Sequence, residues 1–121
     1  MTPFGAKMRE LRAARELTLK RMAEDLQISA AYLSALEHGK RGRPRRMLVL
    51  QIATYFELGW EEQEELDALV RLSDPRVTVD TAGLPPKTTE LANEFARRIR
   101  HLPEATIDRL LQILRNDGKQ K

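Results

Sequence analysis

The sequence predicts an all-α protein, with five short helices in residues 1–72 and a helical hairpin near the C-terminus. Apolar residues recur at spacings of three and four along most of the chain, which places them on one face of a helix. Residues that commonly begin or end helices interrupt this pattern at short intervals. A length of 121 residues allows one compact domain and an appendage.

The first three helices are expected to be short and closely spaced. The first would run from Phe4 to Arg15, and its apolar face would comprise Met8, Leu11 and Ala14. Thr18 is a suitable N-cap for the second, because its hydroxyl can accept a hydrogen bond from a first-turn N–H. The apolar face of the second helix would comprise Leu19, Met22, Ala23 and Leu26. A connection at Gln27 and Ile28 then leads to Ser29, the expected N-cap of a third helix that ends at Glu37.

Glycine and proline set the expected limits of the next two helices. Gly39 can take the left-handed conformation that closes the third helix. Pro44 is expected as the first residue of the fourth helix, where its missing N–H costs nothing. This helix would have a broad apolar face, made of Met47, Leu48, Val49, Ile52, Tyr55 and Phe56, and would be closed by Gly59. An acidic fifth helix is expected from Trp60 to Leu72, with Trp60, Leu66, Leu69 and Val70 facing the core.

Residues 73–86 are predicted to be a linker or arm, because they contain four helix-breaking residues, Pro75, Gly83, Pro85 and Pro86. Residues 87–115 are predicted to form the C-terminal hairpin, and residues 116–121 a flexible tail. The two stripes of the hairpin comprise Leu91, Phe95, Ile99 and Leu102, and Ile107, Leu110, Leu111 and Leu114. These stripes could fold back on the first 72 residues or pair with a second copy, and we expect them to form a homodimer.

The composition excludes several classes of function. The chain has no cysteine, so thiolate metal sites and cysteine nucleophiles are excluded, and its two histidines stand in separate segments. There is no glycine-rich phosphate loop and no pattern of a catalytic triad. We therefore expect no cofactor, no metal site and no enzymatic activity. No apolar run approaches the ~18 residues of a membrane span, so we expect a cytoplasmic protein.

Positive charge is concentrated in the first half of the chain. Residues 1–60 contain 11 Lys and Arg against 6 Asp and Glu, whereas residues 61–82 contain 2 against 7. Five of the seven residues from Lys40 to Arg46 are cationic. A short helix pair beside a dense cluster of cations is typical of proteins that place a helix in a DNA groove.

Residues Met8 to Leu58 resemble the Cro/repressor-type helix-turn-helix family of bacterial and phage transcriptional regulators, also called the XRE family. The residues that carry the resemblance are Arg12, Leu17, Thr18, Met22, Ala23, Ile28, Ser29, Leu33, Ser34, Leu36, Glu37, His38, Gly39, Lys40, Pro44, Leu48 and Ile52. The resemblance implies a lambda-repressor-like, five-helix DNA-binding domain. It also implies a structural ion pair between Arg12 and Glu37, and a recognition helix at residues 29–37.

Carried over by position, the resemblance implies a set of residues that face double-stranded DNA. They are Thr18, Lys20, Arg21, Ser29, Ala30, Ala31, Tyr32, Ser34, Ala35, His38, Lys40, Arg41, Arg43, Arg45 and Arg46. The recognition helix lacks the Arg, Gln and Asn side chains that make bidentate contacts to bases. Specificity would therefore depend on Tyr32, on water and on DNA shape.

The resulting hypothesis is a homodimeric regulator, acting as a repressor on a pseudo-palindromic operator and located at the nucleoid when bound to DNA. Two alternatives remain open at the level of the sequence. In the first, the protein is the DNA-binding antitoxin of a toxin–antitoxin pair, and its C-terminal segment binds a toxin. In the second, it is an adaptor that uses the helix-turn-helix fold to bind a protein, such as a co-regulator, instead of DNA.

Overall fold

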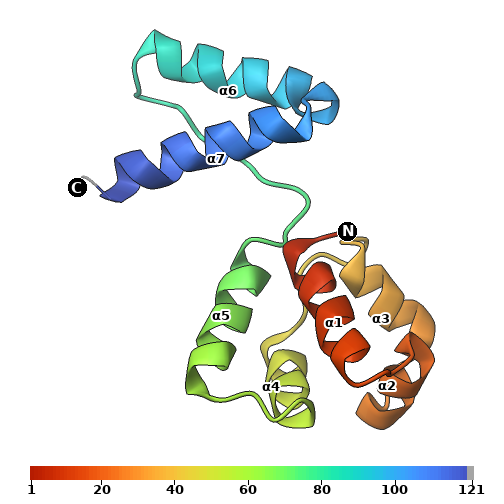
Figure 1. The fold of residues 1–121 in the computed structure, drawn as a ribbon. Coiled ribbons are helices and arrows are strands. Elements are labelled where there is room, and N and C mark those ends of the chain that lie inside the picture. Colours follow the sequence, from red (N-terminus) through yellow and green to blue (C-terminus); the bar gives the residue numbers. More distant parts are fainter. Residues whose placement is uncertain (120–121) are drawn as a thin grey trace. The chain divides into compact units, whose positions relative to one another are not determined.

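The computed structural model describes residues 1–119, with side chains up to residue 117, and these residues contain helices and no strand (Figure 1). The predicted all-α class is therefore confirmed. The elements are α1 (Pro3–Ala14), α2 (Leu19–Leu26), α3 (Ala30–Glu37), α4 (Arg46–Tyr55), α5 (Trp60–Arg71), α6 (Pro86–Arg98), the 3₁₀ helix η1 (Ile99–His101) and α7 (Glu104–Lys119).

The chain divides into two compact units. The N-terminal unit, Met1–Val77, contains α1 to α5, and the C-terminal unit, Thr78–Lys121, contains α6, η1 and α7. The division into a domain at residues 1–72, a linker, a hairpin and a tail stays a prediction. Within the N-terminal unit, α1 packs against both α3 and α5, and α2 packs against α3 and α4.

Local capping interactions explain where the first three helices begin. Thr2, Thr18 and Ser29 have extended backbone conformations, and each side chain accepts a hydrogen bond from a backbone N–H three residues later. Gly39 closes α3 in the left-handed conformation, with a φ of 78°. The N–H of Lys40 then donates to the carbonyl of Ala35 at 2.8 Å, as expected at a glycine-terminated helix.

The predicted limits of the fourth helix are wrong at both ends. Pro44 is buried in the N-terminal unit, and α4 begins two residues later, after Arg45 in an extended conformation. At the other end α4 stops at Tyr55, because Glu57 takes the left-handed conformation with a φ of 53°. Gly59 does not close α4 and is instead the N-cap of α5.

The core of the N-terminal unit draws on all five helices. Its fully buried large side chains are Phe4, Met8, Met22, Leu33, Leu36, Ile52, Leu66 and Glu37. The predicted core positions Trp60 and Met47 are wrong, since these side chains are 73% and 68% exposed. Trp60 lies six residues before Leu66, so the two side chains are separated by about 240° around the helix axis. Because Leu66 faces the core, Trp60 lies on a different side of α5 and faces solvent.

Two contacts join the start of α1 to other parts of the N-terminal unit. The N–H of Thr2 donates to the carbonyl of Glu37 at 3.0 Å, at the end of α3. The hydroxyl of Ser73 accepts a hydrogen bond from the N–H of Phe4 at 2.9 Å and donates to the carbonyl of Leu69 at 2.5 Å. Ser73 is buried, so α5 is held against α1 at its C-terminal end.

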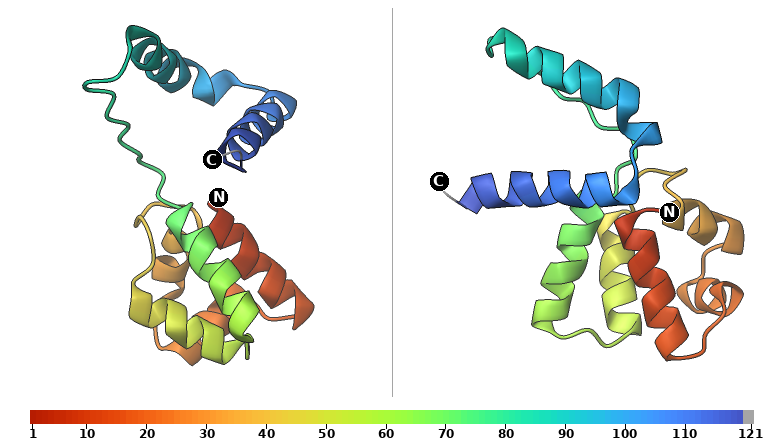
Figure 2. Two further views of the ribbon diagram at one scale, coloured as in Figure 1. Left: turned by 90° about the vertical axis from the view of Figure 1, so that its left-hand side faces the viewer. Right: turned by 45° about the horizontal axis from the view of Figure 1, so that its top comes forward.

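The helices of the C-terminal unit diverge from a corner at η1, as Figure 2 shows. Phe95, Leu102, Ile107 and Leu110 are half-buried, and no side chain described in this unit is fully buried. Helix α7 continues to Lys119, so residues 116–119 of the predicted tail are helical. The polar side chains of Arg115, Asn116 and Asp117 are exposed, which is compatible with a helix at this position. Residues 120–121 of the predicted tail lie outside the described residues.

Candidate nucleic-acid interface

The helix pair α2–α3 has a short turn built from Gln27, Ile28 and Ser29. Gln27 takes the left-handed conformation with a φ of 60°, and the N–H of Ile28 donates to the carbonyl of Ala23 at 3.0 Å. Ala23 is buried in the core of the unit, and its small side chain favours the close packing of α2 against α3. The two helices are consequently held at a fixed angle, with α3 at the edge of the N-terminal unit (Figure 1).

The N-terminus of α3 is exposed and well defined. Ser29 is exposed, and its hydroxyl accepts a hydrogen bond from the N–H of Tyr32 at 3.0 Å. Ala31 is also exposed, whereas Ala30 and Tyr32 are half-buried and pack against the core. A helix N-terminus carries partial positive charge and favours an anion such as phosphate. The exposed part of this helix end is therefore suited to a DNA backbone.

The remaining positions of α3 expose little polar surface. Ser34 and Ala35 are half-buried, and His38 is exposed. A ring nitrogen of His38, Nδ1, lies 2.9 Å from the carbonyl oxygen of Ser34, which fixes the ring beside the last turn. The surface of α3 thus offers small side chains and one partly accessible tyrosine.

Residues 40–46, which lead from the end of α3 into the first residue of α4, carry five exposed cationic side chains. They are Lys40, Arg41, Arg43, Arg45 and Arg46, and we call this segment the basic loop. Gly42 takes a φ of 73°, and the buried Pro44 anchors the segment to the N-terminal unit. The guanidinium carbon of Arg41 lies 5.9 Å from the ring centroid of Tyr32, a cation–π contact that joins the basic loop to α3.

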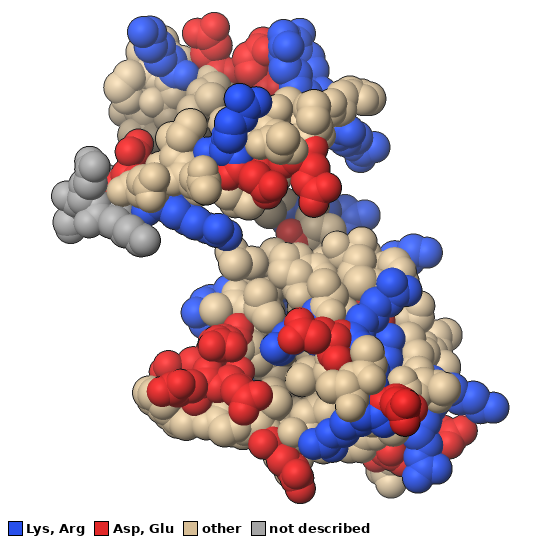
Figure 3. All heavy atoms as spheres, viewed as in Figure 1, with Lys and Arg blue, Asp and Glu red and all other residues tan. Residues whose placement is uncertain are grey.

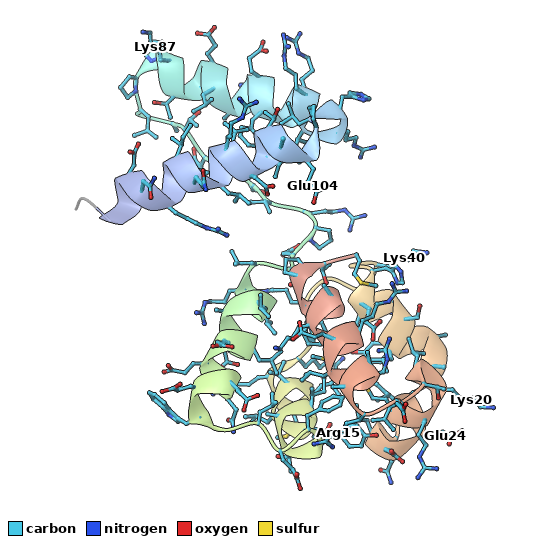
Figure 4. All side chains as sticks on the ribbon, in the orientation of Figure 1. Arg15, Lys20, Glu24, Lys40, Lys87 and Glu104 are labelled. Carbon is cyan, nitrogen blue, oxygen red and sulfur yellow. The ribbon has the colours of Figure 1, made fainter. Side chains whose placement is uncertain are left out.

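The predicted contacts on α2 lie at its exposed first turn. Thr18 caps the helix, and Lys20 extends outward from the outer edge of the helix pair, as does Lys40 at the end of α3 (Figure 4). Arg21 is exposed, and its Nε donates to Oδ2 of Asp25 at 3.3 Å. Asp25 therefore partly neutralises one of the cations assigned to DNA.

The hydroxyl of Tyr55 also donates to Asp25 Oδ2, at 2.6 Å. Partial burial, and then the hydrogen bond to Asp25, raise the pKa of the Tyr55 hydroxyl above its usual value of 10.0. This bond links α4 to the end of α2. Sequence reasoning missed it, because Tyr55 was assigned only to the apolar face of its helix and no local motif pairs it with Asp25, 30 positions away.

Arg12 and Glu37 form a bidentate ion pair in the interior of the N-terminal unit. Arg12 Nη1 donates to Glu37 Oε2, and Arg12 Nη2 donates to Glu37 Oε1 at 3.3 Å. The side chain of Glu37 is 1% exposed. The pair joins α1 to the last residue of α3, so it supports the helix-turn-helix from behind and is not available to DNA.

Charge is unevenly distributed over the surface of the N-terminal unit. Acidic side chains gather over the start of α5, and most of the basic side chains in this view lie toward α2 and α3 (Figure 3). The acidic residues are Glu61, Glu62, Glu64 and Glu65. They occupy the helix end at which negative charge is favourable. The face formed by α2, α3 and the basic loop is consequently the face that would attract a polyanion.

Arg15 is a further structural contact that sequence reasoning missed. Its Nη1 and Nη2 donate to the carbonyls of Tyr55 and Phe56 at 3.1 and 3.0 Å. These are carbonyls at the end of α4, where a cation is favourable. Its guanidinium also lies over the ring of Phe56. No local pattern pairs Arg15 with residues forty positions away.

No helix in the part of the chain that the structure describes is long and apolar enough to cross a membrane. No solved structure matches the chain. A family model described as a helix-turn-helix domain matches residues 3–69, which is more than half of the chain.

Two curated proteins of Bacillus subtilis (strain 168) are similar to the chain. It is 41% identical over 61 residues to an uncharacterized HTH-type transcriptional regulator, RghRB, an alignment that covers 50% of this chain and 44% of that protein. It is 36% identical over 61 residues to the HTH-type transcriptional repressor RghR, covering 50% of this chain and 45% of that protein. The chain thus spans less than half the length of these relatives. From the fold, the capped helix pair and the match to the family model, we conclude that the chain belongs to the helix-turn-helix domain family.

Proposed function

We propose that the chain is a sequence-specific repressor that binds double-stranded DNA with α3 in the major groove. The observation that carries this proposal is the exposed, serine-capped N-terminus of α3 beside the five exposed cations of the basic loop. A major groove admits one α-helix, and the phosphates that flank it favour cations at its edge. The repressor role is supported by the name of one relative, the HTH-type transcriptional repressor RghR.

The two parts of this surface would have different roles. Lys40, Arg45 and the other cations of the basic loop would contact phosphates, which positions the protein without reading sequence. Ser29 and Tyr32 would contact base edges through single hydrogen bonds, and Ala31 could contact a thymine methyl group. Because these contacts are few, DNA shape and deformability would supply part of the specificity.

A homodimer would present two copies of α3 to a pseudo-palindromic operator. Helix-turn-helix proteins commonly bind two half-sites one helical turn apart, which requires two-fold symmetry. The C-terminal unit supports this proposal because several of its large apolar side chains are exposed, whereas the N-terminal unit has a core of its own. The exposed side chains on its helices include Leu91, Ile99, Leu111, Ile113 and Leu114. A pair of helices this short does not usually bury enough apolar surface to be stable alone.

The experiment starts with selection of bound fragments from the source genome and footprinting of the best one. Binding of the full chain to that operator and to a random duplex is then measured across a range of salt concentrations. Tyr32→Phe, which keeps the aromatic ring, should reduce the preference for the operator by about fivefold, because one base hydrogen bond is lost. Arg45→Ala should weaken binding to both duplexes and lower the salt slope by about one, because one phosphate contact is lost.

Arg9→Ala is the matched control, since Arg9 is exposed on α1 and outside the proposed interface. This variant should retain the operator preference and the salt slope. A wild-type chain that binds neither duplex would refute the proposal. If Tyr32→Phe weakened both duplexes equally, the role of Tyr32 in reading bases would be refuted.

A further inference from the structure

A hollow of about 340 Å³ lies between the basic loop and α5. The side chains around it include three arginines, Arg43, Arg46 and Arg71, and one carboxylate, Asp67. Pro44 and Val49, which are both buried, also line it. The hollow therefore combines an apolar lining with charged groups from two separate parts of the N-terminal unit.

The charges around this hollow are unbalanced. Among the described residues, none of the ion pairs involves Arg43, Arg46 or Arg71. Asp67 offsets one positive charge, which leaves an excess of two. Like charges that share one site repel each other, and the fold provides no second carboxylate in the lining to relieve this repulsion. An anion that enters the hollow would remove the repulsion.

The start of α4 adds to the same imbalance. Arg45 is the N-cap of α4 and Arg46 its first residue, and no side chain caps the helix. The N-terminal end of a helix favours negative charge, so two arginines at this end are unfavourable in the protein by itself. A bound anion would offset both the repulsion among the arginines and their unfavourable position at the helix end. It would interact favourably with the guanidinium groups and with the N-terminus of α4.

We infer that the hollow formed by Arg43, Arg46 and Arg71 binds a phosphate group. The planar guanidinium fork matches phosphate oxygens and can donate two hydrogen bonds at once. A volume of about 340 Å³ accommodates a phosphate together with part of its ester substituents. Where the group belongs to a DNA backbone, the inference rests on the proposed function, and Arg71 then extends the DNA interface from the basic loop to α5. A free phosphate has the same chemistry.

The test has one arm without DNA and one arm with it. In the first, the full chain is titrated with inorganic phosphate, and NMR follows the backbone amides of Arg46 and Arg71. In the second, affinity for a duplex is measured across a range of salt concentrations.

Both arms use Arg71→Gln, Asp67→Asn and the control Arg9→Gln. Arg71→Gln should weaken phosphate binding at least fivefold and lower the salt slope by about one. Asp67→Asn should strengthen binding in both arms, because it removes the opposing charge.

The two arms separate the sources of phosphate. A response in the duplex arm alone supports the inference with the DNA backbone as the ligand, and a response in the inorganic phosphate arm alone supports it with a free phosphate. The inference is overturned if phosphate causes no shifts at Arg46 and Arg71 and if the salt slope is the same for Arg71→Gln and Arg9→Gln. If the wild-type chain binds no duplex, the proposed function fails, and the inorganic phosphate arm alone decides the inference. Thermal melting of each variant confirms that it is folded.

Discussion

At the scale of single residues, the buried ion pair between Arg12 and Glu37 has the largest consequence for stability. A carboxylate that is 1% exposed is acceptable in an apolar interior only when its charge is matched by a partner. Arg12 supplies both charge and bidentate geometry. The pair therefore makes the position of α3 depend on a residue of α1.

We expect Arg12→Met to reduce the free energy of unfolding by about 3 kcal/mol, because it leaves the Glu37 carboxylate buried without a partner. Urea denaturation provides the measurement. The control is Lys7→Met, which breaks the exposed pair of Lys7 with Glu10 and should cost less than about 0.5 kcal/mol. The double variant Arg12→Met/Glu37→Met should recover most of the loss. A loss that is equal in the Arg12 and Lys7 variants would contradict this account.

The hydrogen bond from Tyr55 to Asp25 predicts a pH effect at the alkaline end. The pKa of Tyr55 is raised in the folded chain, mainly by burial and then by the bond to Asp25, so folding favours the protonated hydroxyl. The stabilisation is therefore complete below the usual pKa of 10.0 and is lost as the pH rises through the folded pKa. Between about pH 9 and about pH 11, the wild-type unfolding free energy should fall more steeply than that of Tyr55→Phe. Tyr32→Phe serves as the control, and it should keep the steeper wild-type fall.

At the scale of the elements, the close approach of α1 to the end of α3 depends on Gly5. A Cβ atom built on Gly5 would lie 2.1 Å from the carbonyl oxygen of Glu37, which is a backbone atom that cannot rotate away. The carbonyl also accepts hydrogen bonds from the N–H and hydroxyl of Thr2. The two helices can therefore meet only if position 5 has no side chain.

Gly5→Ala should lower the free energy of unfolding by about 3 kcal/mol, because the new methyl group forces α1 away from Glu37. Thermal and urea unfolding report this loss. Gly59→Ala is the matched control, since the nearest atom to a Cβ at Gly59 lies at 3.8 Å and its φ of −72° is ordinary. If the two substitutions cost the same, the close packing of α1 on α3 would not be the cause.

The starts of α2 and α3 were predictable because capping is local. Thr18 and Ser29 accept hydrogen bonds from backbone groups three residues away, so the sequence itself contains both partners. The start of α4 was not predictable in this way, because it depends on the burial of Pro44 in the folded unit. Trp60 was wrongly expected in the core because hydrophobicity alone does not say which side of α5 faces inward.

The candidate interface shows the same limit. Residues of the basic loop were found from sequence because they are contiguous. Arg71 was missed because it lies 25 residues after Arg46 and reaches the same hollow only through the packing of α5 beside α4. Arg21, which the sequence analysis assigned to the DNA contact, is exposed, but its pairing with Asp25 reduces the charge that it can offer to DNA.

At the scale of the whole molecule, the C-terminal unit has apolar surface that its own two helices leave uncovered. Leu91 on α6 and Leu114 on α7 are 62% and 63% exposed, and Ile113 is 56% exposed. Because the two helices diverge, their contact lies near η1, and the apolar side chains farther along α7 lack cover within the unit. A second copy of the same unit would provide the missing contacts in the proposed homodimer.

We expect the full chain to sediment with twice its mass of 13.9 kDa, and we expect Leu114→Glu to shift it to the monomer. Burying a carboxylate in an apolar interface without a partner costs several kcal/mol, which exceeds what a small dimer can lose. Sedimentation velocity gives the mass directly. Gln112→Glu adds the same charge at a polar, exposed position of α7 and should leave the dimer intact. A wild-type monomer at micromolar concentration would contradict the homodimer.

The hydrogen bond between Phe4 and Ser73 has a consequence for the order in which the N-terminal unit folds during synthesis. It joins residues 69 positions apart, and Leu66 of α5 is part of the same core as Phe4. A ribosome releases the chain from its N-terminus, so α1 emerges long before the residues that cover it. The helix-turn-helix can form its local turns early, but the core cannot close until Ser73 has left the exit tunnel. Nascent chains halted before this point would therefore expose Phe4 and Met8 to chaperones.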